Sequence, residues 1–175
     1  SKAIVRLLNE EPIQYILEKI SFYGLEFICT PSALIPRAET EELVDWIIKS
    51  DTNGISILDI GTGTGCISVS LANHNCFVVD ALDVSSSALE LAKQNAKQNK
   101  VDINLIEADI FEYKSHKKYD LIVSNPPYVR NLEKKKMQNN VLHFEPELAL
   151  FVEDDDPLVF YLSLIHISEP TRRRG

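Results

Sequence analysis

The sequence has few of the residues that mark metal, disulfide or membrane proteins. It contains three cysteines and four histidines; the cysteines lack the C-x-x-C spacing of a zinc site, and their odd number does not fit a disulfide framework. No apolar stretch approaches the roughly 18 residues of a membrane span, and the first residues contain no apolar segment of a secretory signal. We therefore expect no metal site, no membrane association and a cytoplasmic location. The cysteines expected in the core are Cys29, Cys66 and Cys76.

Basic residues are also scarce. The net charge is −8, and because three arginines and one glutamate lie in 163–175, residues 1–162 carry 15 basic and 25 acidic residues, a net charge of −10. A protein that binds bare nucleic acid usually has a basic face, so we expect no direct nucleic-acid partner. Apolar residues make up 45% of the chain, which excludes disorder and is enough to build a folded core.

The first 50 residues predict helical segments around a β-hairpin. Apolar residues recur at helical spacing from Ala3 to Ile20, with a new helical turn at Pro12. Two aromatic-rich runs on either side of a glycine predict a hairpin within 21–29. An extended loop is expected over 31–36, and a further helix from Glu39 to Lys49.

From residue 55 the pattern changes to alternating strands and helices. Four short apolar runs are typical of buried parallel strands, and helices are expected after the first two. A capping box from Ser87 to Glu90 is expected to open the second of these helices, which ends near Asn99. This alternation indicates an α/β fold with a parallel sheet and right-handed crossovers. The predicted strands are 55–60, 77–83, 103–107 and 121–124.

A glycine-rich turn follows the first predicted strand. The sequence Asp59-Ile60-Gly61-Thr62-Gly63-Thr64-Gly65 leads from that strand into a helix. Glycines there let the backbone approach a ligand closely, and the start of the helix offers free N–H groups. A dinucleotide fingerprint needs glycine at the sixth position, which is Cys66. G-x-G-x-G after an acidic strand end instead predicts binding of S-adenosylmethionine.

Two carboxylates at the ends of the next strands support this prediction. Asp83 ends the second strand, 22 residues after Gly61, where a carboxylate can accept both ribose hydroxyls. Asp109 follows the third strand and is placed to meet the adenine edge. A tight turn between strand and helix would need neither acid, so the three features together favour a cofactor site.

A second motif, Asn125-Pro126-Pro127-Tyr128, follows the fourth predicted strand. Open parallel sheets bind ligands beyond the carboxyl ends of their strands, and two prolines hold the backbone here before a ligand arrives. The side-chain carbonyl of Asn125 and the main-chain carbonyl of Pro126 can accept both hydrogens of one planar amino or amide group. Tyr128 offers a flat surface for stacking. The motif therefore predicts a site for a planar amino or amide substrate.

Together the two motifs resemble those of amino-methylating class I methyltransferases. Two further stretches resemble the peptide chain release factor glutamine methyltransferases; they are 22–27 leading to 34–41, and 144–151. The resemblance covers about residues 10–162. It implies a Rossmann-like fold with helices on both faces of the sheet and S-adenosylmethionine as cofactor. The implied reaction is methyl transfer to the glutamine side-chain nitrogen in the Gly-Gly-Gln loop of a release factor, the expected protein partner.

The resemblance also implies roles for individual residues. The glycine loop would hold the methionine part of the cofactor, Asp83 the ribose, and Asp109 with Ile110 the adenine. The family's aromatic residue near Ile110 is here one position later, at Phe111. The implied cofactor-binding residues are Gly61, Thr62, Gly63, Thr64, Gly65, Asp83, Asp109, Ile110, Phe111 and Asn125. The implied substrate-binding residues are Asn125, Pro126, Pro127 and Tyr128, and of these Asn125, Pro126 and Tyr128 are expected to be catalytic.

Two other functions fit parts of the sequence. An adenine-N6 or other nucleic-acid amino methyltransferase can use the same tetrapeptide, but the acidic body and the lack of a basic, aromatic-laced stripe disfavour it. A non-catalytic module that only binds the cofactor would be favoured by loss of a motif residue, and all of them are present.

Both ends of the sequence depart from the family pattern. A class I methyltransferase has seven strands, whereas four are predicted here, and 163–175 stop matching the family after the start of a helix at 157–162. We expect a sheet truncated after the fourth strand, whose outer edge exposes apolar surface. The expected division is 1–20 as the remnant of an N-terminal helical domain, 21–36 as hairpin and loop, 37–162 as an incomplete methyltransferase domain, and 163–175 as a non-native tail.

Overall fold

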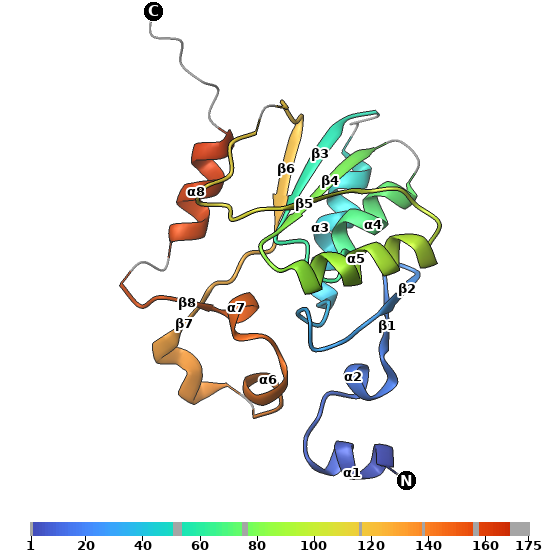
Figure 1. The fold of residues 1–175 in the computed structure, drawn as a ribbon, viewed down its shortest axis with the longest axis vertical. Helices are drawn as coiled ribbons and strands as arrows, with labels where there is room; N and C mark the ends of the chain where they lie inside the picture. Colours follow the sequence, from blue (N-terminus) through green and yellow to red (C-terminus); the bar gives the residue numbers. More distant parts are fainter. Residues whose placement is uncertain are drawn as a thin grey trace, which may run out of the picture.

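A parallel sheet of four strands forms the centre of the computed structural model, which describes residues 2–50, 54–74, 77–115, 117–137, 139–155 and 158–168. The strand order is β5-β4-β3-β6 (Figure 1), so the chain order reverses at β3, where open α/β sheets bind ligands. All four strands begin and end within one residue of their predicted bounds. They are β3 Ser56–Ile60, β4 Val78–Asp83, β5 Asn104–Glu107 and β6 Leu121–Ser124.

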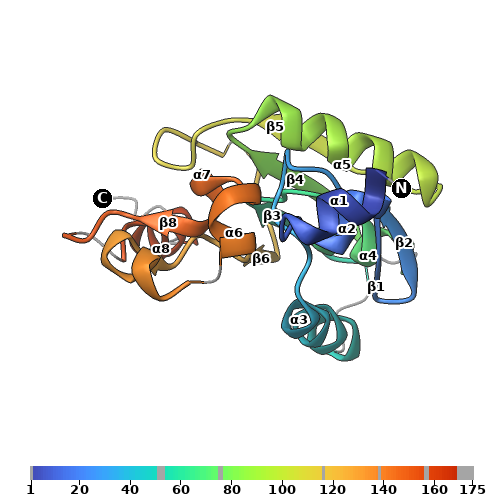
Figure 2. The ribbon, with the colours of Figure 1, turned by 90° about the horizontal axis from the view of Figure 1, so that it is seen from below.

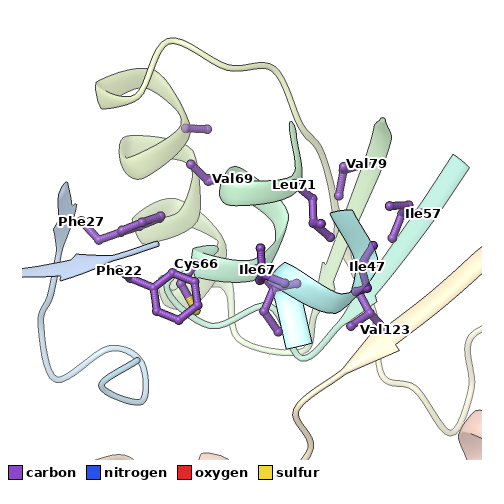
Figure 3. Packing of buried hydrophobic residues seen from close by; sticks show 12 residues of the cluster. Phe22, Phe27, Ile47, Ile57, Cys66, Ile67, Val69, Leu71, Val79 and Val123 are labelled. Atoms are coloured by element: carbon purple, nitrogen blue, oxygen red, sulfur yellow. The ribbon is translucent and has the colours of Figure 1, made fainter. Parts of the chain in front are cut away.

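Helices cover both faces of this sheet, as predicted. On one face, Ile57 and Val79 pack against a cluster that includes Ile47, Ile67 and Leu71 (Figure 3). The helices on this face are α3 Ala38–Lys49, α4 Cys66–Asn73 and α5 Ser86–Gln98. On the other face, alternate strand residues pack against helix α8, Val159–Ser168. The alternation follows from the two-residue period of a strand, which sends successive side chains to opposite faces.

The N-terminal segment contains two short helices and a hairpin. They are α1 Lys2–Leu8, α2 Ile13–Leu17, β1 Lys19–Phe22 and β2 Leu25–Ile28. The hairpin is confirmed, but the prediction that helix extends to Ile20 is wrong. Glu18 adopts a left-handed conformation that ends α2, and Ile20 pairs with Phe27 across the hairpin. The spacing of the isoleucines fits a helix, but pairing with β2 decides their conformation.

The start of α5 also differs from the prediction. The capping residue is Ser85, whose hydroxyl accepts a hydrogen bond from the backbone N–H of Ala88 at 3.2 Å. The predicted capping box at Ser87 is therefore wrong by two positions. Three consecutive serines offer equivalent capping groups, and the one that directly follows the turn after β4 is used.

The segment after β6 lies at the end of the sheet where the strands finish (Figures 1 and 2). It consists of β7 Val129–Arg130, the 3₁₀-helix η1 Asn131–Lys136, α6 Asn139–Phe144, α7 Glu147–Leu150 and β8 Phe151–Val152, with β7 and β8 paired in parallel. Phe144 packs against the cluster formed by Tyr15, Cys29 and Ile35. The segment thereby joins the N-terminal part of the chain to the site edge of the sheet.

Strand β6 forms one edge of the sheet. In the described parts of the chain it pairs only with β3, and an apolar groove lies beside it. The groove is lined by residues of α3, β6 and α8, among them Trp46, which is 71% exposed. This agrees with the predicted apolar edge. Helix α8 starts near the predicted position and continues to Ser168, so the expected boundary at 162 falls inside a helix.

Three further predictions concern the cysteines, the tail and membrane association. Cys29 and Cys66 are buried free thiols, as expected. Cys76 and residues 169–175 lie outside the described residues. In the ranges that the structure describes, no helix combines the length and the apolar character needed to cross a membrane.

Candidate cofactor and substrate site

The glycine loop between β3 and α4 has a backbone that only glycine adopts without strain. Gly61, Gly63 and Gly65 have φ angles of 72°, 55° and 77°, in the left-handed region. The backbone N–H groups of Gly61 and Thr62 donate to the carbonyl of Leu82, at 2.8 and 3.1 Å. The loop therefore lies across the carboxyl end of β4, beside Asp83.

A buried carboxylate holds this loop to the end of β3. Asp59 is fully buried, and its Oδ2 accepts hydrogen bonds from the hydroxyls of Ser68 and Thr62, the latter at 2.7 Å. The two hydroxyls also lie 2.8 Å from each other. Burial raises the pKa of Asp59 to about 6, although the hydrogen bonds from Ser68 and Thr62 favour the charged form. The strand, the loop and the first helical turn are thus joined around one buried carboxylate whose charged form is destabilised by burial.

Replacing Asp59 with asparagine should make the folded state more stable at neutral pH. Because the folded-state pKa is raised, the contribution of Asp59 to stability is present below about pH 4 and is lost as the pH rises through about 6. The asparagine side chain would keep an acceptor without the buried charge, so Asp59→Asn should gain up to about 3 kcal/mol at pH 7 relative to pH 4. Urea unfolding at both pH values measures this gain.

The exposed Asp102 provides the control for this experiment. Asp102→Asn removes the same charge from a solvated position and should change the free energy of unfolding by less than about 0.5 kcal/mol at either pH. If the difference in the free energy of unfolding between wild type and Asp59→Asn stayed constant from pH 4 to pH 7, the raised pKa of Asp59 would be contradicted.

Asp83 is fixed at the end of β4 by two backbone groups. Its Oδ2 accepts from the N–H of Gly63 and its Oδ1 from the N–H of Ser85, both at 2.9 Å. Each carboxylate oxygen has a second lone pair, so both can still accept a hydroxyl hydrogen from a ligand. The carboxylate is therefore oriented before any ligand binds.

Most of the predicted site residues line one cavity, although they come from four separate strand ends. The glycine loop, Asp83, the segment after β5 and the tetrapeptide after β6 meet there. The predicted residues on its wall are Gly61, Thr62, Gly63, Thr64, Asp83, Asp109, Ile110, Phe111, Asn125, Pro126 and Pro127.

Two predicted residues lie outside this wall. Gly65 is the N-cap residue directly before α4, and it packs against α5: a Cβ atom at this position would lie 3.0 Å from the Cβ of Ala92. Tyr128 is 64% exposed, and it directly follows the part of the tetrapeptide that lines the cavity. The structure brings eleven predicted residues together and places these two beside them.

The adenine end of the predicted site contains a pair of aromatic rings. Ile110 is buried, whereas Phe111 is half exposed, and its ring lies 5.2 Å from the ring of Phe160 on α8. Both rings line the cavity. The carboxylate of Asp109 accepts from the N–H of Phe111 at 2.9 Å, which holds the turn that carries Phe111.

The tetrapeptide begins where β6 ends against β3. The hydroxyl of Ser124 donates to the carbonyl of Ile60 at 2.7 Å, which fixes the residue before Asn125. In the part of the chain that the structure describes, the side chain of Asn125 has no hydrogen-bond partner. Its amide is therefore available to a ligand in the cavity.

Several cavity residues were missed by the sequence reasoning. They belong to the loop after β2, to the first turn of α3, to the segment around α7 and to α8, and they are Ser32, Ala33, Leu34, Ile35, Pro36, Arg37, Thr40, Pro146, Leu148, Ala149 and Phe160. The available signal is that the stretches 34–41 and 144–151 resemble those of a known family. Most of their side chains are apolar, and the sequence alone indicates no site role for the polar ones, Ser32, Arg37 and Thr40.

Curated proteins similar to this chain include release factor glutamine methyltransferases. The release factor glutamine methyltransferase of Flavobacterium psychrophilum is 51% identical over 173 residues, which cover 94% of this chain and 60% of that protein. The protein with the same name from Bacteroides thetaiotaomicron is 46% identical over 175 residues, which cover 98% of this chain and 63% of that protein. The chain thus spans less than two thirds of these relatives.

The fold is also found among solved structures. A tRNA (uracil-54, C5)-methyltransferase of Pyrococcus abyssi, solved in complex with S-adenosyl-L-homocysteine, superposes with a TM-score of 0.55 at 20% identity, covering 85% of this chain and 37% of that one. At this identity the likeness concerns the fold alone. The family model described as methyltransferase small domain matches residues 39–145, which is more than half of the chain. The chain therefore belongs to the methyltransferase small domain family.

Proposed function

We propose that the chain carries the catalytic site of a protein-(glutamine-N5) methyltransferase. The proposed enzyme transfers a methyl group from S-adenosylmethionine to the side-chain amide nitrogen of the glutamine in the Gly-Gly-Gln motif of peptide chain release factors. The observation that carries the proposal is that Asn125, Pro126 and Pro127 share one cavity with the glycine loop and Asp83. The names of the relatives support the choice of substrate. We place the catalytic domain in 37–162 and the enzyme in the cytoplasm.

The residues present fit the proposed cofactor. Gly61 and Gly63 leave the loop backbone uncovered at the cavity, where the N-terminus of α4 favours a carboxylate. The fixed carboxylate of Asp83 can accept ribose hydroxyls, and Ile110 with Phe111 offers apolar surface for adenine. When bound, S-adenosylmethionine supplies an electrophilic methyl group on a sulfonium that is already a good leaving group.

The tetrapeptide addresses the main difficulty of the reaction, which is that an amide nitrogen is a weak nucleophile. In the proposed mechanism, the Asn125 side-chain carbonyl and the Pro126 carbonyl accept the two N–H hydrogens of the substrate amide. This favours lone-pair density on nitrogen and aims it at the methyl group, so most of the acceleration comes from positioning and electrostatics. No strong general base is needed, because the proton can leave after transfer.

A methyl-transfer assay tests the proposed function. The purified chain is incubated with S-adenosylmethionine labelled on the methyl group and, in separate reactions, with a release factor, with the same release factor carrying Gln→Ala in its Gly-Gly-Gln motif, and with DNA. We expect label in the first reaction alone. Label in DNA alone would support the nucleic-acid alternative, and binding of the cofactor product without any transfer would support a binding module.

Cofactor affinity provides a second prediction. Asp83→Ala removes the acceptors for the ribose hydroxyls and the bond to Gly63. Because loss of hydrogen bonds to a charged group costs about 1.5–3 kcal/mol, the dissociation constant of S-adenosylhomocysteine should rise at least about tenfold. Calorimetric titration measures it. Asp102→Ala, which alters an exposed carboxylate, should leave the affinity unchanged, and an equal loss in both variants would refute the role of Asp83.

A further inference from the structure

An ion pair between a buried carboxylate and a partly exposed guanidinium connects two walls of the cavity that come from distant parts of the sequence. Glu145 lies between α6 and α7, and its side chain is 1% exposed. Its Oε1 accepts from Nη2 of Arg37 at 2.7 Å, and its Oε2 accepts from the backbone N–H of Ile35 at 3.3 Å. One carboxylate thus holds the loop after β2 at two points.

The same loop is also held from its other side. The hydroxyl of Tyr15, a buried residue of α2, donates to the carbonyl of Ala33 at 2.9 Å. Ile35 packs in the cluster with Tyr15 and Cys29, to which Phe144 adds its ring. Burial is the main reason why the pKa of Tyr15 and of Cys29 is raised, and the negative charge of Glu145 raises both further. The loop is therefore clamped between α2 and the residues that lead into α7.

Both partners of the ion pair lie at the cavity wall: Arg37 is part of it, and Glu145 directly precedes residues that are part of it. Arg37 and the residues before it line the cavity on one side, and Pro146, Leu148 and Ala149, which follow Glu145, line it on the other. The cofactor loops are held separately, by the bonds of Asp59 to Thr62 and of Asp83 to Gly63. Loss of the ion pair would therefore move these two walls and leave the cofactor loops in place.

We propose that Glu145 is a positioning residue, which acts through Arg37 and the loop 33–37 to hold the cavity walls between which the substrate glutamine reaches Asn125. The identity of that substrate rests on the proposed function. Burying the carboxylate of an ion pair is a costly way to stabilise a fold, since apolar residues of similar size often do as well or better. The buried carboxylate of Glu145, paired with a residue of the cavity wall and directly followed by others, is explained by the geometry it imposes on substrate access.

Another ion pair, which also joins a buried carboxylate to a partly exposed cation, serves as a matched control. Asp80 is buried in the sheet, with its side chain 4% exposed, and it pairs with Lys117 at 2.9 Å. Lys117 is 46% exposed and Arg37 is 37% exposed, so each pair joins a buried carboxylate to a partly exposed cation. Neither Asp80 nor Lys117 lines the cavity.

The experiment neutralises each pair without leaving a lone buried charge. The test variant combines Arg37→Met with Glu145→Gln, which keeps an acceptor for the Ile35 N–H. The control variant combines Lys117→Met with Asp80→Asn. Each is compared with wild type for KM and kcat with a release factor, for S-adenosylhomocysteine affinity, for thermal stability, and for hydrogen exchange of amides 33–35 and 147–150.

We expect the test variant to raise KM for the release factor at least about tenfold, with kcat and S-adenosylhomocysteine affinity changed less than about threefold. The control should keep its KM within about twofold, even where its thermal stability falls as far. Amides 33–35 and 147–150 should exchange at least about tenfold faster in the test variant alone. Equal KM changes in both variants, or unchanged exchange in the test variant, would overturn the proposal.

The two proposals fail in different ways. A wild-type chain that transfers no methyl group to the release factor refutes the proposed function. Hydrogen exchange then decides the positioning role alone: faster exchange at both walls in the test variant supports it, and unchanged exchange refutes it.

Discussion

Asn125→Ala should slow methyl transfer to a release factor by at least about 100-fold, the size of effect seen when one preorganised hydrogen-bonding group is removed from a transition state. The variant loses the side-chain carbonyl that is proposed to accept one hydrogen of the substrate amide. The opposite hydrogen would still meet the carbonyl of Pro126, but the nitrogen would be free to rotate away from the methyl group. Single-turnover rates with saturating S-adenosylmethionine measure the loss.

The control for this prediction is Asn73→Ala. Asn73 is exposed at the end of α4 and does not line the cavity, so its variant should transfer methyl groups at the wild-type rate. S-adenosylhomocysteine affinity should fall less than about tenfold in Asn125→Ala. A variant without Asn125 that keeps full transfer activity would rule out the proposed amide clamp, even if the protein methylates release factors.

The largest expected effect on stability is that of Gly65→Ala. The new Cβ would meet the Cβ of Ala92 at 3.0 Å and its Cα at 3.2 Å, and the backbone atom cannot rotate away. The residue would also have to keep a φ of 77°, which costs roughly 1–2 kcal/mol for a residue with a side chain. Together with about 1–3 kcal/mol for overpacking, the free energy of unfolding should fall by about 2–5 kcal/mol in urea titrations.

Gly24→Ala separates the two contributions. Gly24 lies in the hairpin turn at a φ of 75°, and a Cβ there would meet nothing within 4 Å. This variant should therefore lose only the conformational part, about 1–2 kcal/mol. Equal losses in Gly24→Ala and Gly65→Ala would show that the contact between α4 and α5 can relax. The stated packing role of Gly65 would then be wrong.

The central sheet could be predicted because its signals are local. Short apolar runs such as 121–124 fit buried parallel strands, and the glycine loop with Asp83 identifies the carboxyl ends of two of them. These signals, together with the tetrapeptide and the family resemblance, named eleven residues that line a common cavity. Such motifs are informative because their residues need a particular backbone conformation and occupy a fixed place in a βαβ unit, so that the sequence alone locates them at the ligand-binding end of the sheet.

The remaining parts depend on contacts between distant residues. Ile20 has helical spacing with its predecessors, yet it forms a strand because Phe27 pairs with it. Gly65 belongs to a ligand-binding motif, but its lack of a side chain serves the contact with Ala92. The ion pair of Arg37 and Glu145 joins residues 108 positions apart, and neither sequence neighbourhood indicates its partner.

The exposed Trp46 gives this chain a built-in optical reporter. It is the single tryptophan, and it stands at 71% exposure on the rim of the groove beside β6. Its emission in the folded protein should already resemble that of indole in water, so unfolding should change it little. Whatever covers the groove should shift the emission to shorter wavelength, which makes a fluorescence spectrum of the unlabelled protein a direct reading of whether that sheet edge is open.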